Sequence, residues 1–272
     1  MKKFLVIPNS LELLGKVLET DVDGVILPIE HLAVNSSIYF TVEDVKSILN
    51  ITSKEVCVSL NKIMHSSDLN LLEEILIALN KLNISKIFFY DLAVLSVAKK
   101  LGIKKELVIF QDHLNASDYS HRFYKKRGVT YSLVTSDITR DEMNEIAKEM
   151  PLMVMCYGYL PIFYSRRYLV TNYLEYISKE KEEGVYYIRN KDDRYPIVEE
   201  EYGTTIYTTE PVCLLNDFED LEVEYGVLNS VLVSNEKFLK VLEGYLKGRK
   251  NTDQYYTGFL NKKTVYKVED YE

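Results

Sequence analysis

Seven short apolar runs, each followed by an amphipathic segment, restrict the fold of this chain more than any other feature. The runs are apolar almost without interruption, which is typical of strands covered on both faces. Their first residues are roughly 20 to 31 positions apart, the length of one strand plus one helix. They begin at Phe4, Gly24, Glu55, Lys86, Glu106, Thr130 and Leu152. The sequence therefore predicts successive βα units.

The segments between these runs have the signals of helices. Several begin at a Ser, Thr or Asp, the residues that cap helix N-termini, and two end at glycine. An open doubly wound sheet would normally have a glycine-rich phosphate loop after its first strand, and the segment IPNSLEL from Ile7 has none. We therefore predict an α/β fold, a (β/α)8 TIM-like barrel, formed as a single domain over residues 1–272.

The alternation stops after the seventh run. Residues 175–209 are charged and rich in tyrosine, and the alternating segment TTIYTT from Thr204 predicts a β-ribbon inserted before strand eight of the barrel. The eighth strand is predicted from Val227 and its helix from Asn235. Residues 250–272 then form a polar and aromatic C-terminal extension.

Composition excludes several classes of protein. The formal charge of -8 argues against binding nucleic acid by bulk electrostatics, although a local basic pocket stays possible. The first apolar stretch is too short for a signal peptide, and no run approaches the ~18 apolar residues of a membrane helix. The three cysteines lie far apart without metal-ligand spacing, which predicts buried thiols in a reducing cytoplasm.

Polar residues follow most of the predicted strands, at the end where barrels of this type carry their reactive groups. Together they predict an amide-rich, weakly acidic rim with no metal-ligand spacing and no lysine placed to form a Schiff base. They are Asn9, Glu30, His31, Asn61, His65, Asp91, Gln111, Asp112, His113, Asp137 and Tyr157.

Each of these residues also has a structural alternative. His65 has the pKa of a general base, but a loop or cap histidine is the more common role. Asp91 and Asp137 stand where helix N-caps stand. Asn61 and Gln111 need partners if they are buried, and a ligand or an ordered water would serve equally.

Arg166 and Arg167 are the strongest sign of a ligand. Arginine offers a rigid fork that matches a carboxylate or phosphate, so two of them at the start of a predicted helix after strand seven indicate an anion site at the barrel mouth. The alternative is an ion pair with the acidic run from Glu199 to Glu201. The sequence weighs these two interpretations equally.

Six blocks of sequence resemble one known family. They are NKIMHSSDL from Asn61, VTSDITRDEMNEI from Val134, YGYLPIFYSRRYLVTNYL from Tyr157, RYPIVEEEYGT from Arg194, PVCLLNDFEDL from Pro211 and YTGFLNKKTVY from Tyr256. The chain thereby resembles the peptidase U32 family, collagenase-like proteins that include bacterial tRNA and rRNA hydroxylation factors and ubiquinone-hydroxylation accessory proteins. In that frame the family positions after strand seven are matched by Gly158, Ser165, Arg167, Asn172 and Tyr173.

The chain departs from the family where many members hold an iron-sulfur cluster. Pro161 and Tyr168 stand in place of the first two cluster cysteines, and the later cysteine pair is absent, so a four-cysteine cluster is not expected. The charged segment that the family usually has at strand eight is replaced by LNSVLVS from Leu228. The resemblance is greatest to small clusterless members that occur beside a longer paralogue and are associated with 5-hydroxylation of the tRNA wobble uridine.

The resemblance implies a factor in tRNA wobble-uridine 5-hydroxylation that acts with a longer paralogue. The alternatives are a U32-type peptidase and a non-catalytic binding paralogue. No cofactor is expected. A prephenate-like carboxylate or an RNA phosphate is the anion expected at the arginines. No catalytic residue is assigned, and the predicted substrate- or anion-binding residues are Asn61, His65, Asp91, Gln111, Tyr157, Ser165, Arg166, Arg167, Asn172 and Glu201.

Overall fold

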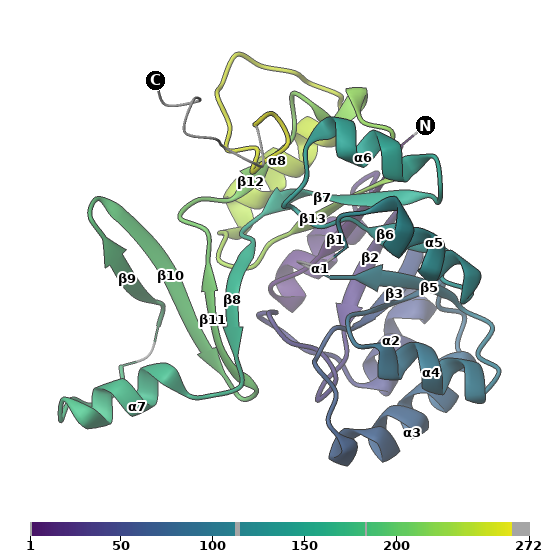
Figure 1. Cartoon of the computed structure of the whole chain (residues 1–272), viewed down its shortest axis with the longest axis horizontal. Coiled ribbons are helices and arrows are strands. Elements are labelled where there is room, and N and C mark those ends of the chain that lie inside the picture. The colour runs from purple at the N-terminus through teal and green to yellow at the C-terminus, as the bar shows by residue number, and fades with distance from the viewer. Residues whose placement is uncertain (1, 112–114, 183, 263–272) are drawn as a thin grey trace.

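Eight parallel strands close into a barrel in the computed structural model, which describes residues 2–111, 115–182 and 184–262 (Figure 1). The first and last strands pair in register from Lys3–Tyr225 to Ile7–Asn229, and this pairing closes the ring. The strands are β1 (Lys3–Ile7), β2 (Gly24–Pro28), β3 (Glu55–Leu60), β4 (Lys86–Phe89), β5 (Glu106–Phe110), β6 (Tyr131–Leu133), β7 (Leu152–Gly158) and β13 (Tyr225–Asn229). The predicted (β/α)8 barrel is confirmed, including its eighth strand.

Helices surround the barrel in the order predicted. Side chains of Ser10, Thr41, Ser117, Thr139 and Ser234 accept a backbone hydrogen bond at the first turn of their helices, which fixes where those helices begin. The helices are α1 (Leu11–Leu18), α2 (Val42–Ile51), α3 (Leu69–Asn80), α4 (Leu92–Lys100), α5 (Asp118–Lys126), α6 (Arg140–Ala147) and α8 (Asn235–Leu246). Short 3-10 turns lie at Ser66–Asp68 and Phe218–Asp220. No helix within the described ranges is long and apolar enough to cross a membrane.

The inside of the barrel has three layers, because alternate residues of each strand point inward. The bottom layer, at the strand starts, contains Glu55, Lys86, Tyr131 and Tyr225. The middle layer is apolar and buried, with Leu5, Ile26, Cys57, Phe88, Val108, Leu133, Met153 and Val227. The top layer, at the strand ends, includes Ile7, Ser59, Phe110, Met155 and Asn229.

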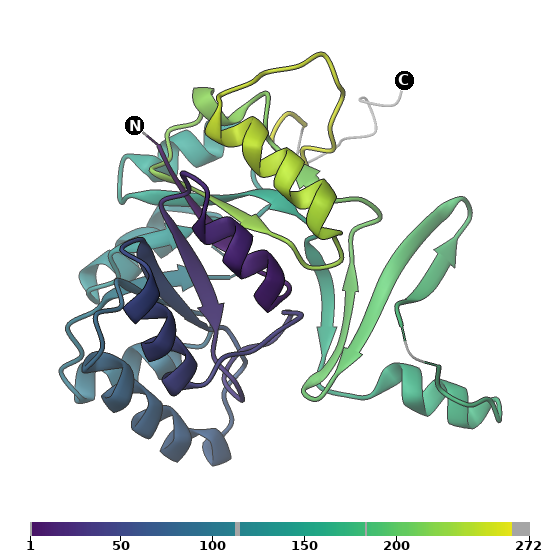
Figure 2. The ribbon, with the colours of Figure 1, turned by 180° about the vertical axis from the view of Figure 1, so that it is seen from behind.

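A second sheet projects from the barrel as an arm (Figures 1 and 2). Its four antiparallel strands lie in the order β8-β11-β10-β9, and a helix, α7, follows its first strand. The bounds are β8 (Pro161–Ser165), α7 (Leu169–Tyr176), β9 (Tyr186–Asn190), β10 (Asp193–Glu200) and β11 (Gly203–Tyr207). We call residues 161–207 the arm.

The arm is larger than the ribbon predicted over residues 175–209. The chain leaves β7 through a turn at Gly158, whose φ of 140° and close approach to the carbonyl of Asn229 leave no room for a side chain. It then enters β8 instead of a helix. After the arm, β12 (Val212–Cys213) pairs antiparallel with the end of β7. The described part of the predicted extension, up to Lys262, lies against this region. The carbonyl of Tyr256 accepts a hydrogen bond from the backbone of Cys213, and that of Leu260 accepts one from the backbone of Arg140.

Candidate functional site at the barrel mouth

The mouth of the barrel contains a cavity of about 40 Å³ beside one of about 140 Å³. The two adjoin, because Asn35, Asn61 and Pro161 line both. The first is floored by the top layer of the barrel interior and also lined by Ser36, Gln111, Ser136 and Tyr159. The second lies between the loop after β2 and the first strand of the arm, with Phe163 and Tyr164 as its outer wall.

Two predicted site residues at the mouth are occupied by structural hydrogen bonds. Both atoms of the Asn61 amide bond the backbone of Val34, at 3.1 Å each, and thereby hold the loop that carries Asn35 and Ser36. The Gln111 amide donates to the carbonyl of Tyr90 at 3.1 Å and accepts from the Tyr124 hydroxyl at 3.2 Å. Asn61 and Gln111 thus line the cavity while serving to position its walls.

Asp91 and His65 do not line the cavity. Asp91 caps α4 by accepting from Ala93 at 2.8 Å, and its other oxygen accepts from Met64 at 3.0 Å, so the N-cap alternative is confirmed. His65 is exposed, and its backbone donates to Asp68. The other predicted rim residues Asp112 and His113 lie outside the described residues.

Tyr157 points away from the mouth. Its ring packs against Phe238 of α8, and its hydroxyl is buried with no hydrogen-bond partner among the described residues. Burial raises the pKa of Tyr157 to about 12. Sequence position placed it at the strand end, but the register of β7 shifts opposite Val227–Leu228, which turns the side chain outward.

The atoms free to bind a ligand at the mouth are ones that the sequence did not single out. Within the described part of the chain, the hydroxyls of Ser59 and Ser136 and the amide nitrogen of Asn229 have no hydrogen-bond partner. Ser59 is only 2% exposed and Asn229 8%, so these groups face the cavity rather than open solvent. The sequence signal that could have identified Ser59 and Asn229 is a single polar residue, facing inward, at the C-terminal end of an otherwise apolar strand.

The described walls of the mouth are electrically neutral. Apart from the tyrosines Tyr90, Tyr159 and Tyr164, no residue lining either cavity can ionise in the described ranges. Burial, with Tyr187 and Glu210 nearby, raises the pKa of Tyr159, and burial raises the pKa of Tyr164 to about 12, so both stay uncharged near neutral pH. The described walls of these two cavities therefore offer hydrogen bonds and apolar contact rather than charge.

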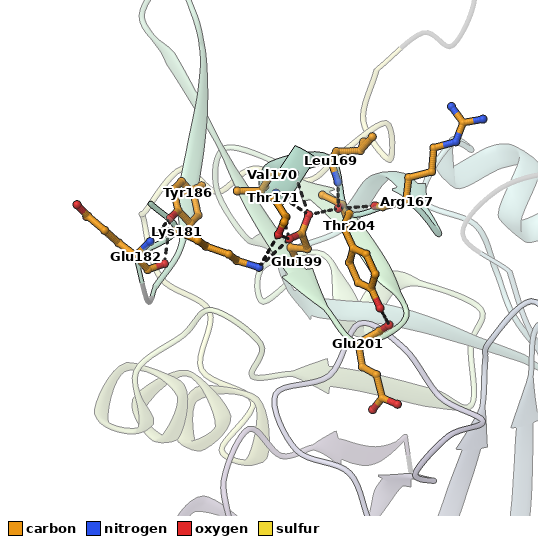
Figure 3. A network of polar contacts seen from close by, with 11 residues as sticks. Arg167, Leu169, Val170, Thr171, Lys181, Glu182, Tyr186, Glu199, Glu201 and Thr204 are labelled. Carbon is orange, nitrogen blue, oxygen red and sulfur yellow. Dashed lines mark hydrogen bonds and ion pairs between the residues drawn. The ribbon is translucent and has the colours of Figure 1, made fainter. Parts of the chain in front are cut away.

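The two arginines are not at the mouth. Arg166 and Arg167 follow β8 at its far end, are exposed, and line neither cavity. In Figure 3 the guanidinium of Arg167 points away from the surrounding polar network. The expectation that both point into the barrel mouth is therefore wrong, because the chain after β7 enters a strand and carries them to the other end of it.

The alternative prediction, an ion pair between these arginines and Glu199, Glu200 or Glu201, is also wrong for the described residues. Glu199 accepts hydrogen bonds from Val170 and Thr171 at the first turn of α7, and from Lys181 at 2.7 Å (Figure 3). Burial on its own would raise the pKa of Glu199, but these donors lower it to about 2. Glu199 therefore holds α7 to the arm sheet.

The remaining predicted residues also lie on the arm. The Ser165 hydroxyl accepts from the backbone of Arg167 at 3.2 Å. The carbonyl of Glu201 accepts from the Tyr168 hydroxyl at 2.7 Å, and its carboxylate is exposed. Asn172 is exposed on α7. None of the three lines the mouth cavities.

Contacts at the β10–β11 turn fasten the arm across the mouth. The Tyr39 hydroxyl donates to Glu200, and the Tyr202 hydroxyl bonds His31. Lys62, which follows β3, donates to the His31 carbonyl at 3.1 Å, and its ammonium lies 4.4 Å from the Tyr202 ring centroid. These contacts fix the outer wall of the second cavity against its inner wall.

A serine–histidine contact exists, but it is not at the mouth. The Nε2 atom of His121 lies 2.9 Å from the Ser132 hydroxyl, which also accepts from Asn115 at 2.7 Å. Both His121 and Ser132 are fully buried between β6 and α5, and burial lowers the pKa of His121. The pair is inaccessible to a substrate, so it provides no nucleophile for a peptidase.

The fold and the position of the cavity are those of a (β/α)8 barrel with a site at the C-terminal ends of its strands. The profile of peptidase family U32 matches residues 9–251, and the chain belongs to that family.

Two relatives illustrate the similarity. The chain is 28% identical over 223 residues to tRNA hydroxylation protein P2 of Bacillus subtilis (strain 168), covering 76% of this chain and 72% of that protein. The solved structure of the U32 peptidase Mk0906 superimposes with a TM-score of 0.54 at 12% identity, over 84% of this chain and 92% of the other. The structural likeness supports the fold alone.

Proposed function

We propose that this protein takes part in 5-hydroxylation of the tRNA wobble uridine, together with a longer U32 paralogue. The similarity to tRNA hydroxylation protein P2, which extends over most of both chains, carries this proposal. The mouth supports it independently, because a cavity whose described walls are neutral, with hydroxyl and amide groups that have no described partner, suits an uncharged nucleobase better than an anion.

The chemistry of uracil matches the groups available. Its ring is neutral and planar, with carbonyl acceptors and one N–H donor on its edges. The Asn229 amide nitrogen can donate, and the hydroxyls of Ser59 and Ser136 can donate or accept. Leu133, Met155 and Phe110 supply apolar contact to the faces of a ring. A base that enters the mouth has to leave its stack, as bases in single-stranded loops readily do.

The part of this chain in the reaction is, in our proposal, to bind rather than to transform the base. The described lining residues include no carboxylate, histidine, lysine or cysteine that could transfer a proton or act as a nucleophile. The three thiols are all buried: Cys57 is inside the barrel, and Cys156 and Cys213 lie near Tyr245 of α8. Their separation by the barrel wall also supports the expectation of no iron-sulfur cluster.

The peptidase alternative receives less support. Burial raises the pKa of all three cysteine thiols, which keeps them protonated and unreactive, and the Ser132–His121 contact is inaccessible. The anion-binding role of Arg166 and Arg167 stays a prediction. On an exposed turn, an RNA phosphate suits them better than a small prephenate-like carboxylate, which would need an enclosing pocket.

Mass spectrometry of tRNA nucleosides tests the proposal. A strain lacking this gene, with every paralogue intact, should lose most of its 5-hydroxyuridine-derived nucleosides, and the wild-type gene should restore them. Ser59→Val together with Asn229→Leu should fail to restore them at equal protein level, whereas Ser53→Ala, on the opposite end of the barrel, should succeed. Unchanged nucleosides in the deletion strain would refute the proposal.

A further inference from the structure

Two arginines on the arm face each other across a strand pair. Arg189 of β9 and Arg194 of β10 are direct cross-strand partners, and both are exposed. Like charges placed directly opposite destabilise an antiparallel pair. A carboxylate in place of either arginine would keep the surface charged and would attract the remaining guanidinium instead of repelling it. The two opposed arginines therefore lower the stability of the strand pair, which a purely structural pair would avoid.

These two arginines have no described ion-pair partner, although acidic residues outnumber basic ones in the chain. Lys and Arg number 33 against 41 Asp and Glu, yet neither guanidinium forms an ion pair with a described carboxylate. Two other arginines of the same chain are paired: Arg122 lies 2.8 Å from Asp118, and Arg140 contacts Asp217 at 2.5 Å. The cross-strand pair therefore presents free charge to an anionic partner.

An exposed aromatic ring adjoins the pair. Tyr187 is two residues before Arg189 and so on the same face of β9, it is 48% exposed, and the Arg194 guanidinium lies 4.5 Å from its ring centroid. We call Tyr187, Arg189 and Arg194 the arginine strip. The strip lies on the outer strand pair of the arm sheet, whose order is β8-β11-β10-β9 and whose opposite edge, β8, lines the second cavity with Phe163 and Tyr164.

We propose that the arginine strip binds single-stranded RNA, with the guanidinium groups on backbone phosphates and the Tyr187 ring against a base. Aromatic rings interleaved with arginine are the recurrent means by which proteins hold unpaired bases and their backbone. The inference rests on the proposed function, because that function brings an RNA loop to the barrel mouth, which is walled by the opposite edge of the same sheet. The mouth then receives one base while the strip holds nucleotides farther along the same strand.

Fluorescence anisotropy with the full chain and a labelled RNA hairpin carrying a uridine-containing loop tests this. Arg189→Ala with Arg194→Ala should raise the Kd by roughly tenfold or more at low salt. The slope of log K against log salt should also fall by about 1.4, or ~0.7 for each lost phosphate contact. Tyr187→Ala should weaken binding by roughly tenfold, whereas Tyr187→Phe should not.

A matched control removes the same charge elsewhere. Arg127→Ala with Arg249→Ala, two exposed arginines outside the arm, should leave Kd and slope close to wild type. Circular dichroism confirms that each variant is folded. Equal weakening of RNA binding by both double variants would indicate bulk electrostatics and contradict the proposal. Absence of RNA binding by the wild type would also contradict it. So would a result in which binding of a polyglutamate peptide requires the arginine strip but binding of RNA does not.

The nucleoside assay separates this inference from the proposed function. If gene deletion abolishes the modified nucleosides while the strip variant binds the hairpin normally, the function stands and the strip is wrong. If deletion leaves the nucleosides unchanged while hairpin binding depends on the strip, the RNA surface stands and the wobble-uridine function is wrong.

Discussion

The two ends of the barrel are built from opposite kinds of polar group. At the bottom, the Lys86 side chain is only 4% exposed, and its ammonium contacts Glu55, Glu106 at 3.0 Å, and the rings of Tyr131 and Tyr225. At the mouth, Ser59, Ser136 and Asn229 are uncharged and keep hydrogen-bonding atoms without described partners.

This difference teaches how one barrel separates stability from function. Burial on its own would lower the pKa of Lys86, but its bond to Glu55 raises it, so the ammonium stays charged in the fold. Glu55, Lys86 and the Tyr225 hydroxyl thus satisfy one another within the described chain. The mouth leaves its hydrogen bonds unmade, which gives up stability and keeps a site open. In barrels of this type, residues at the N-terminal ends of the strands usually serve stability, and residues at the C-terminal ends usually serve function.

The largest effect should follow from breaking the bottom. Lys86→Ala leaves the Glu55 carboxylate buried without its partner, and we expect the free energy of unfolding in urea to fall by about 3–5 kcal/mol. As a control, Lys100→Ala removes an exposed pair with Glu73 and should cost no more than about 1 kcal/mol. Equal losses in the two variants would contradict the special role of the bottom layer.

The next effect concerns the arm that walls the mouth. Glu199→Gln weakens the bonds to α7 and to Lys181, and we expect a loss of about 2–3 kcal/mol from the stability of the arm near neutral pH, measured by hydrogen exchange of α7 amides. Barrel amides should be unaffected. Uniform destabilisation of arm and barrel would mean that the arm does not unfold separately.

The contribution of Glu199 to the stability of the arm should also depend on pH. Because the pKa of Glu199 is lowered to about 2 in the folded protein, its contribution is full above the ordinary glutamate pKa near 4.5. It is lost as the pH falls from there toward 2. The Glu199→Gln variant should therefore show a shallower acid loss of α7 protection than wild type. Parallel curves for the two proteins would show that Glu199 is not the group responsible.

At the mouth the expected pattern is reversed. Ser59→Ala removes a hydroxyl with no described partner, so unfolding free energy should change by less than about 0.5 kcal/mol. Complementation of the modified tRNA nucleosides should nonetheless fall by severalfold, since one ligand hydrogen bond is worth about 0.5–1.5 kcal/mol. A stability loss with full complementation would assign Ser59 to the scaffold.

The smallest effect on stability should come from the exposed end of the arm. Arg167→Ala removes a side chain with no described ion pair, and the melting temperature should stay within about a degree of wild type. If the predicted anion role holds, hairpin binding should still weaken by about tenfold, with only partial recovery in Arg167→Lys. Unaltered binding would end that prediction.

Much of the scaffold was readable from sequence. Continuous apolar runs and capped amphipathic segments predicted the barrel, because burial on both faces and helix periodicity act over a few neighbouring residues. The N-cap alternative for Asp91 before α4 is confirmed for the same reason, although Asp91 was also among the predicted binding residues. The −8 charge, and the absence of four cysteines to hold a cluster, are likewise properties of the sequence alone.

Only the tertiary structure decided which polar groups are free. Ser59 and Asn61 both line the mouth, but both atoms of the Asn61 amide bond Val34, 27 residues away, while the Ser59 hydroxyl has no partner among the described residues. Likewise, the turn at Gly158 sends the chain into β8, so Arg166 and Arg167 lie a strand's length from the site predicted for them. Pairing across such distances depends on how strands and loops assemble, and local residue patterns do not encode it.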